Sequence, residues 1–394
     1  MRLSAVFWGL ACLGMVMVAS AAAGSSRETD VVQTVLIQRA LWMGMGAVAF
    51  AVGAGIRYTF WRRHSLGLMI VAVGALIAVL IPGIGTMVNG ARRWIRLGPW
   101  IGTQPSEMAK VILIIWAAAY VERNADKMDR FLDGFLVPFG IAGAASVLVL
   151  LEPDFGTAAL IGMLAGLVLI VYGTRLLYVM FAVAAMLPVA HHVILGTPYR
   201  RERIMTFLNP WKEPLDAGYQ LIQSKISVGS GGLMGRGLGL GVQKLGFLPD
   251  ASSDFVFAMI AEELGFIGAG FVVIAFLIVA WEGFRLVLRA PDRFGSALAL
   301  GITALFGIQG ALHMAVVTGS VPTTGMTLPL VSAGGSSLFF CMFAAGILVN
   351  IARRVEKTPN IQVRPWYRDI PFYEQWLDAR VFRPLKRRLT GGNS

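Results

Sequence analysis

The chain has 394 residues, of which 56% are hydrophobic and only 14% charged, and its formal net charge is +12. Soluble domains carry about 25% charged residues, so this composition excludes an ordinary water-soluble protein. Apolar stretches of about 20 residues, the length of a helix that crosses a bilayer, recur along the chain. They predict about ten transmembrane helices, at residues 4–23, 38–56, 65–84, 105–122, 134–151, 155–173, 175–196, 255–284, 294–319 and 333–352. No stretch alternates as a barrel strand does, so we expect an all-α, polytopic membrane helical bundle.

The first apolar stretch has two interpretations. Arg2, the apolar run and the small residues at 19–24 resemble a signal peptide with its cleavage site. The run is long for the apolar part of a signal peptide, which favours a retained transmembrane helix. Cys12 and Cys341 both lie in predicted spans and form no metal or redox motif, so we expect them to be packing residues.

Arginine and lysine in the connections predict the orientation of the bundle. The tail at 355–394 and three short loops are rich in these residues, which favours the cytoplasmic side. With an even number of spans, both termini are then expected in the cytoplasm. The outer connection with Arg92, Arg93 and Arg96 departs from this tendency, as does the long outer segment 197–253, which includes Arg200 and Arg201. Such basic surfaces suggest an anionic ligand such as a lipid diphosphate, although long loops cross the membrane whatever their charge.

Ionisable residues in or beside the spans are candidate functional residues. Glu107 and Lys110 are three residues apart on one face of the fourth span, and Asp154 lies between the fifth and sixth spans. Together with Arg92, Arg93 and Asp254 they could surround one outward-facing cavity. Alternatively, Glu107 and Lys110 could form an ion pair that fixes the packing of the helices.

The segment 197–253 is long for a connection in a helical bundle, and its length alone indicates function. Its glycines, which include Gly231 and Gly232, allow the backbone to approach a ligand or a neighbouring helix closely. The glycine-rich run has no Gly-Lys-Ser/Thr ending and follows no predicted strand, so we expect no nucleotide.

Asp254 lies where this segment enters the next span. From the residues alone, its carboxylate could cap the helix that follows, as Ser252 and Ser253 could, or it could face a ligand at the outer rim. Glu262 is expected about 12 Å further along the helix axis. It should lie within roughly 80° of Asp254 around the helix, whereas Glu263 should face the opposite way.

Several separate motifs resemble the SEDS family (shape, elongation, division and sporulation), from the first span to about Arg354. They are Gly90–Trp94, Gln104–Glu107 with Lys110, Glu152–Thr157, Gln223–Lys225, Gly229–Leu233, Phe247–Pro249, Asp254–Phe255, Glu262–Gly265, Leu328–Leu330 and Gly334–Ser337. Pro322–Pro329 and Leu97–Pro99 are more similar to division-type members (FtsW) than to elongation-type members (RodA). Asp250, Thr324 and Ala333 depart from the family pattern, which leaves any role of these three positions open.

The resemblance implies a membrane domain at 1–354 that acts as an inverting peptidoglycan glycosyltransferase. It would polymerise lipid II at the outer face of the bacterial cytoplasmic membrane during septal cell-wall synthesis. Asp254 would be the catalytic residue, as a general base or as a ligand of a divalent cation, Mg²⁺ or Mn²⁺. The expected substrate-binding residues are Arg92, Arg93, Glu107, Lys110, Asp154, Lys225, Gly231, Gly232, Glu262 and Ser336.

The implied partners are lipid II, the undecaprenyl-diphosphate-linked glycan, a class B penicillin-binding transpeptidase, other divisome proteins and membrane lipids, but no nucleic acid. The tail, with Trp366 and Trp376, would lie at the membrane interface or bind a partner. A lipid II flippase and a non-catalytic division scaffold are the alternative functions. A carrier keeps its essential charges near the middle of the membrane, whereas an enzyme acting outside needs Asp254 at the outer rim.

Overall fold

The computed structural model describes residues 2–25, 29–88, 90–96, 98, 101–195, 203, 205–216 and 218–357. Some predictions fall outside these residues. They concern Leu97, Pro99, Arg200, Arg201 and the tail from residue 358 onward, including Trp366 and Trp376.

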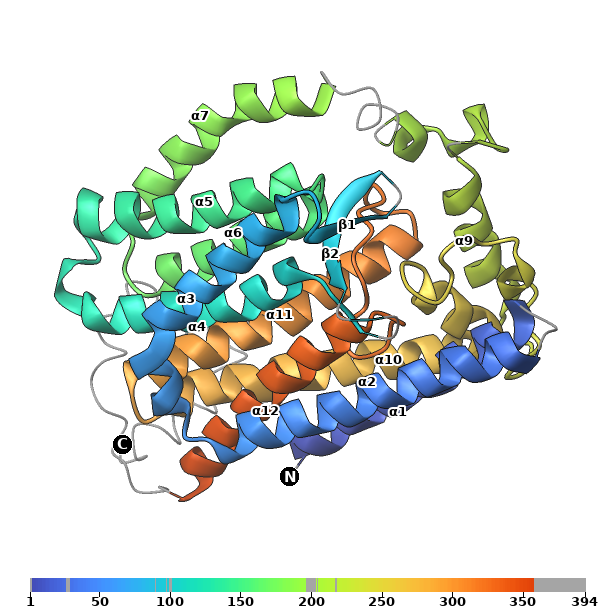
Figure 1. The fold of residues 1–394 in the computed structure, drawn as a ribbon, viewed down its shortest axis with the longest axis horizontal. Coiled ribbons are helices and arrows are strands. Elements are labelled where there is room, and N and C mark those ends of the chain that lie inside the picture. The colour runs from blue at the N-terminus through green and yellow to red at the C-terminus, as the bar shows by residue number, and fades with distance from the viewer. Residues whose placement is uncertain are drawn as a thin grey trace, which may run out of the picture.

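Ten helices of 15 residues or more lie in the described part of the chain, and each overlaps one of the predicted spans; most of them pack together as a bundle, from which α7 stands apart (Figure 1). They are α1 (Arg2–Ser25), α2 (Thr29–Gly55), α3 (Tyr58–Leu80), α4 (Pro105–Arg123), α5 (Val137–Leu151), α6 (Phe155–Val171), α7 (Leu176–Leu195), α10 (Val256–Arg289), α11 (Arg293–Val317) and α12 (Gly335–Lys357). Among the described residues, seven helices are long and apolar enough to cross a membrane, and two shorter apolar helices lie at Phe155–Val171 and Leu176–Ala185. The chain is a multi-pass membrane protein, as predicted.

Helix α4 forms the centre of this bundle. It contacts α3, α5, α6, α11 and α12, and most of its residues from Pro105 to Val121 are buried. A helix that is covered by other helices on all sides needs no lipid-facing apolar stripe. For this reason α4 can carry Glu107 and Lys110 inside the bundle.

The connection between α3 and α4 contains a small antiparallel sheet, which the all-α prediction did not include. Its strands are β1 (Gly85–Val88), β2 (Ala91–Arg96) and β3 (Gly102–Thr103), in the order β1-β2-β3. Ile95 pairs with Gly85 on one side and with Thr103 on the other. These strands have two to six residues and no alternation of apolar and polar side chains, so hydropathy gave no signal for them.

Helix α10 is interrupted at Gly265, where φ is 68° and ψ is −165°. The glycine-rich loop that follows α9 (Tyr219–Ser230) supplies partners for the backbone groups released at this break. The hydrogen bonds are Arg236 N to Glu262 O (2.9 Å), Gly237 N to Glu263 O (3.0 Å), Phe266 N to Gly232 O (2.9 Å) and Ile267 N to Leu233 O (3.2 Å). A Cβ on Gly265 would lie 2.2 Å from Gly235 N, so the close approach of the glycine-rich loop to α10 requires glycine at position 265.

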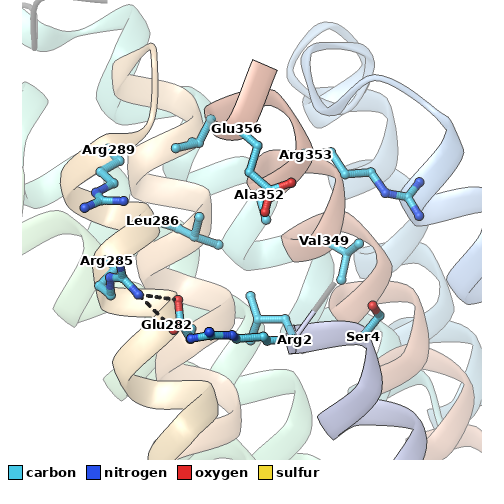
Figure 2. Close-up of a pocket in the computed structure, with 12 residues that line it drawn as sticks. Arg2, Ser4, Glu282, Arg285, Leu286, Arg289, Val349, Ala352, Arg353 and Glu356 are labelled. Carbon is cyan, nitrogen blue, oxygen red and sulfur yellow. Dashed lines mark hydrogen bonds and ion pairs between the residues drawn. The ribbon is translucent and has the colours of Figure 1, made fainter. Parts of the chain in front are cut away.

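The first turn of α1 and the last turns of α12 lie at the same end of the bundle, which we call the terminal end. There, Arg2 and Ser4 of α1 line a cavity of about 430 Å³ together with side chains of α10 and α12 (Figure 2). On α10, Arg285 donates a hydrogen bond of 2.9 Å to Glu282. The small sheet, α9 and the start of α12 lie at the opposite end, which we call the sheet end (Figure 1).

Candidate active site

Asp254 lies at the sheet end, in the turn that precedes α10. The N-cap of α10 is Phe255, and it makes no side-chain cap hydrogen bond. The interpretation of Asp254 as a helix cap is therefore wrong. Within the turn, the backbone N–H groups of Ser253 and Asp254 donate to the carbonyl oxygen of Asp250 at 3.1 and 2.9 Å.

A second loop, between α11 and α12, holds this turn in place. The Ser332 hydroxyl donates to the carbonyl oxygen of Ser253 at 2.6 Å, and the Ala333 N–H donates to the carbonyl oxygen of Ser252 at 2.9 Å. The position of Asp254 thus depends on a loop that lies almost 80 residues later in the chain.

The surroundings of Asp254 raise the pKa of its carboxyl group to about 6. Burial is the largest cause, and the negative charges of Asp250 and Asp154 add to it, whereas Ser253 and Arg203 lower the pKa. Arg203 is held beside this region by its hydrogen bond of 2.9 Å to the carbonyl oxygen of Thr323. A carboxylate with a pKa near 6 is ionised at neutral pH and is still basic enough to accept a proton, which suits a general base.

Two glycines allow the 322–326 segment to pass between Asp254 and α6. A Cβ on Gly325 would lie 3.5 Å from Oδ2 of Asp254, and a Cβ on Gly156 would lie 3.0 Å from the carbonyl oxygen of Thr324. Gly325 also has a φ of +71°, which L side chains rarely adopt. The backbone of this segment therefore forms one wall of the site.

Asp154 lies on the other side of this wall and caps α6. Its Oδ1 accepts from the Thr157 N–H at 3.0 Å, and its Oδ2 accepts from Nε2 of Gln104 at 3.2 Å. Both oxygens have partners within the chain, and the expectation that Asp154 binds substrate stays a prediction. Its charge still acts on Asp254, whose pKa it raises.

Arg92 and Arg93 lie side by side on β2 but have different surroundings. Arg93 donates from Nε to the carbonyl oxygen of Glu152 at 2.8 Å and from Nη2 to that of Pro153 at 2.6 Å. It thereby braces the turn that leads to Asp154. Arg92 makes no hydrogen bond or ion pair with any described residue. Successive side chains of a strand point to opposite faces, which explains why Arg93 contacts the Glu152–Pro153 turn and Arg92 does not.

Glu152 is a buried acid that was not among the predicted site residues. Its side chain has no accessible surface, and neither carboxyl oxygen has a hydrogen-bond partner among the described residues. Burial, and to a lesser extent Asp154, raises its pKa to about 8, against the opposing effect of Arg93. Glu152 is therefore largely protonated at neutral pH. Its position in the Glu–Pro–Asp turn was the available signal in the sequence.

Glu107 and Lys110 form a buried ion pair of 2.8 Å. Nζ of Lys110 also donates to Gln309 at 3.0 Å, Gln309 donates to the carbonyl oxygen of Thr327 at 2.9 Å, and the Thr327 hydroxyl lies 3.0 Å from that of Ser337. Lys110 is 2% exposed and Glu107 6%. This network joins α4, α11 and α12 behind the 322–326 segment. It corresponds to the ion-pair alternative, while direct contact of either charge with substrate stays a prediction.

The carboxylate of Glu262 also accepts hydrogen bonds from the chain itself, and its predicted contact with substrate stays a prediction. It accepts from the N–H groups of Val242 at 2.8 Å and Gln243 at 3.3 Å, and it is 1% exposed. Glu263 pairs with Lys244 at 2.7 Å. The two acids hold the glycine-rich loop against the interrupted part of α10.

The remaining candidates divide into buried and exposed residues. Gly231 is buried, and a Cβ there would lie 1.8 Å from the carbonyl oxygen of Ala261, so its role is close packing. Ser336 is buried in the first turn of α12. Gly232 is exposed, with a φ of +57°. Lys225 is exposed on α9 and makes no hydrogen bond or ion pair among the described residues, so it remains accessible to a ligand.

The expected divalent cation has no ready-made site in the described part of the chain. No group of three or more histidine, cysteine, aspartate and glutamate side chains there could hold a metal ion. The role of Asp254 as a metal ligand stays a prediction.

Residues 1–357 match a family model that unites FtsW, RodA and SpoVE and is described as "Cell cycle protein". A Geobacter sulfurreducens relative named "Probable peptidoglycan glycosyltransferase FtsW" is 39% identical over 351 residues, which cover 89% of this chain and 94% of the relative. Stage V sporulation protein E of Bacillus subtilis is 38% identical over 345 residues, which cover 87% of this chain and 94% of that protein.

Solved structures have the same fold. A chain from "Structural coordination of polymerization and crosslinking by a peptidoglycan synthase complex" aligns with a TM-score of 0.71 at 28% identity, over 88% of this chain and 97% of its own length. The rod shape determining protein RodA of Thermus thermophilus aligns with a TM-score of 0.64 at 24% identity, over 89% of this chain and 96% of its own. At that identity, the RodA match supports the fold alone.

Proposed function

Because this chain belongs to the cell cycle protein family of FtsW, RodA and SpoVE, we propose that it is a peptidoglycan glycosyltransferase that polymerises lipid II. The observation that carries the proposal is the placement of Asp254. This carboxylate lies in the turn before α10, held by the loop between α11 and α12, and not in the middle of a span. Such a location suits an enzyme whose substrates carry their sugars outside the membrane.

The reaction that the family resemblance implies assigns a role to each of these residues. The 4-hydroxyl of the N-acetylglucosamine of incoming lipid II attacks the anomeric carbon of the growing chain, which is linked to undecaprenyl diphosphate. The new C–O bond forms as the bond to the diphosphate breaks, the diphosphate leaves with the electron pair, and the anomeric configuration inverts. Asp254 accepts the proton of the attacking hydroxyl. A positioned base of this kind contributes about 10²–10⁴-fold to the rate.

Positive charge must meet the departing diphosphate. Arg92 and Lys225 suit this role because each has no partner among the described residues. Arg93 acts indirectly, since its guanidinium holds the Glu152–Pro153 turn. A divalent cation would neutralise the same negative charge. In the described part of the chain, no group of three or more histidine, cysteine, aspartate and glutamate side chains could hold a metal ion, so Asp254 would need further ligands from the substrate or solvent to hold one.

The proposal includes where in the cell the protein acts and which partner it works with. Relatives at 38–40% identity are named FtsW, which supports a role in septal synthesis at the division site of the cytoplasmic membrane. The peptidoglycan synthase complex with the same fold couples polymerisation to crosslinking, which supports a class B penicillin-binding transpeptidase as partner, among other divisome proteins. In this arrangement the sheet end faces outward and the terminal end faces the cytoplasm.

A test must separate polymerisation from transport. The full chain would be reconstituted in liposomes with fluorescent lipid II, and both glycan polymer and movement of lipid II across the bilayer would be measured. We expect polymer on a gel and no transport above that of empty liposomes. Transport without polymer would favour the flippase alternative and contradict the proposal.

A further inference from the structure

A second cavity lies at the sheet end, apart from Asp254. It has a volume of about 470 Å³ and lies between α1, α2, the small sheet and the start of α12. Two arginines, two tryptophans and the glycines at the start of α12 dominate its wall. They are Arg39, Arg96, Trp42, Trp94, Gly334 and Gly335.

Arg39 of α2 is a buried charge whose hydrogen bonding is incomplete. It is 3% exposed, and its Nη2 makes only long contacts, of 3.4 Å to Leu330 O and 3.3 Å to Val331 O. Its Nε and Nη1 have no partner among the described residues. Gly14 of α1 makes room for this side chain, since a Cβ there would lie 2.9 Å from Nη2. A buried charge that lacks a counter-charge is costly, so this position favours an anionic ligand.

The rest of the wall adds positive electrostatic potential and contains no acidic side chain among its described residues. Arg96 lies exposed at the end of β2 and forms no ion pair with a described residue. None of the described residues that line the cavity is acidic. Gly334 and Gly335 bring the N-terminus of the 23-residue helix α12 to the cavity, and the free N–H groups at such an end attract anions.

The apolar part of the wall indicates that the anion belongs to a lipid. Trp42 packs against the start of α12, where a Cβ on Gly335 would lie 2.3 Å from its Nε1. Trp94 and the valines at 18, 35 and 88 complete this surface. Tryptophan is typical of the membrane–water interface, where lipid head groups meet acyl chains. We propose that this cavity binds the phosphate group of a membrane lipid, between Arg39 and Arg96.

The cavity shares a wall with the candidate active site without being part of it. The loop between α11 and α12 contributes Ala333 to the cavity, and the same residue donates to the Ser252 carbonyl in the turn before Asp254. Strand β2 carries Arg96 at the cavity and Arg93 at the Glu152–Pro153 turn. A lipid phosphate in this cavity therefore contacts the elements that position Asp254. Binding itself does not depend on the proposed glycosyltransferase reaction.

The test uses the purified full chain and native mass spectrometry with three added lipids. Phosphatidylglycerol and undecaprenyl diphosphate carry phosphate, and diacylglycerol does not. The variants are Arg39→Gln and Arg96→Gln. The control is Lys212→Gln, which removes an exposed positive charge that does not line the cavity.

Thermal unfolding checks that each variant is folded, and Arg96→Gln should disturb folding less than Arg39→Gln because its side chain is exposed. Asp254→Asn should bind these lipids as the wild type does, which separates this site from catalysis.

We expect Arg39→Gln and Arg96→Gln each to weaken one phosphate-lipid site by about tenfold, the effect of losing one charged hydrogen bond. Lys212→Gln and all measurements with diacylglycerol should match the wild type. Loss confined to undecaprenyl diphosphate would identify the ligand as a polyprenyl diphosphate, and loss of both phosphate lipids would identify a general lipid-phosphate site. Unchanged affinity for both lipids in the folded variants would overturn the proposal, as would an equal loss of diacylglycerol.

Discussion

Asp254 has an unusually high pKa for an aspartate, and this predicts how the reaction depends on pH. Its pKa of about 6 results from burial and from the charges of Asp250 and Asp154. Because the base must be ionised, the rate should be full well above pH 6 and should fall about tenfold per unit below it. Asp250→Asn removes one of the negative charges that raise this pKa, so its acidic limb should move to lower pH. Polymerisation rates measured from pH 4.5 to 8 for both proteins check this. Superimposable profiles would contradict the electrostatic account.

The two arginines of β2 should respond differently to the same substitution. Arg92→Gln should weaken the binding of undecaprenyl diphosphate by about 1.5–3 kcal/mol and leave the unfolding temperature unchanged, since Arg92 has no partner in the described chain. Arg92→Lys should recover only part of the affinity, because a planar fork suits paired phosphate oxygens better. Binding titrations would measure both variants.

Arg93→Gln is the matched comparison. It removes two hydrogen bonds to the Glu152–Pro153 turn, so it should lower the free energy of unfolding by about 1–2 kcal/mol, given partial exposure. Equal losses of affinity and stability in the two variants would show that the division of roles is wrong.

The sequence proposed candidate residues for the site but did not specify their contacts. Asp254 and the arginines of β2 were proposed from the motifs. The partners of Glu107, Asp154 and Glu262 did not, because a buried acid can be satisfied by a ligand or by the protein. Asp154 accepts hydrogen bonds from the first turn of α6 and from Gln104. Glu262 accepts hydrogen bonds from two N–H groups of a loop about 20 residues earlier in the chain. Such pairings depend on tertiary structure, which spacing alone does not specify.

Among the secondary-structure elements, the break in α10 predicts that the protein is destabilised by a side chain at Gly265. Gly265→Ala would place a Cβ 2.2 Å from Gly235 N at a φ of +68°, so it should destabilise the protein by about 2–4 kcal/mol through strain and overpacking. Gly270→Ala lies in the same helix with nothing within 4 Å, and it should be neutral or slightly stabilising. Thermal unfolding in one detergent would compare them. A tolerated Gly265→Ala would contradict the close pairing of loop and helix.

The long helices were predictable, and the features between them were not. Hydropathy located all ten helices because each must bury about 20 residues in lipid or protein. The sheet at 85–103 and the break at Gly265 leave no such signal, since they depend on short hydrogen-bonded segments. The position of Asp254 depends on the same kind of short hydrogen-bonded segments, the 250–254 turn and the loop before α12, so the geometry of the candidate site was less predictable than the bundle.

For the whole molecule, the orientation is testable. The first turn of α1 and the last turns of α12 share the terminal end, and the basic tail favours the cytoplasm for that end. A reporter that is active only outside the cytoplasm should therefore be silent when fused after Thr390. A strong signal from this fusion would reverse the orientation and place Asp254 on the wrong side of the membrane.

The central claim is that Asp254 accepts the proton in glycan polymerisation, and one assay tests it most directly. The purified full chain, with its transpeptidase partner, would be given lipid II, and polymer would be scored on a gel for wild type, Asp254→Asn, Asp254→Ala and the neighbouring control Asp250→Asn. We predict a loss of about 10²-fold or more for both Asp254 variants, with Asp250→Asn at neutral pH close to wild type and all proteins equally folded. A rate for Asp254→Ala within about threefold of the wild type, far less than the loss of a general base entails, would contradict the account.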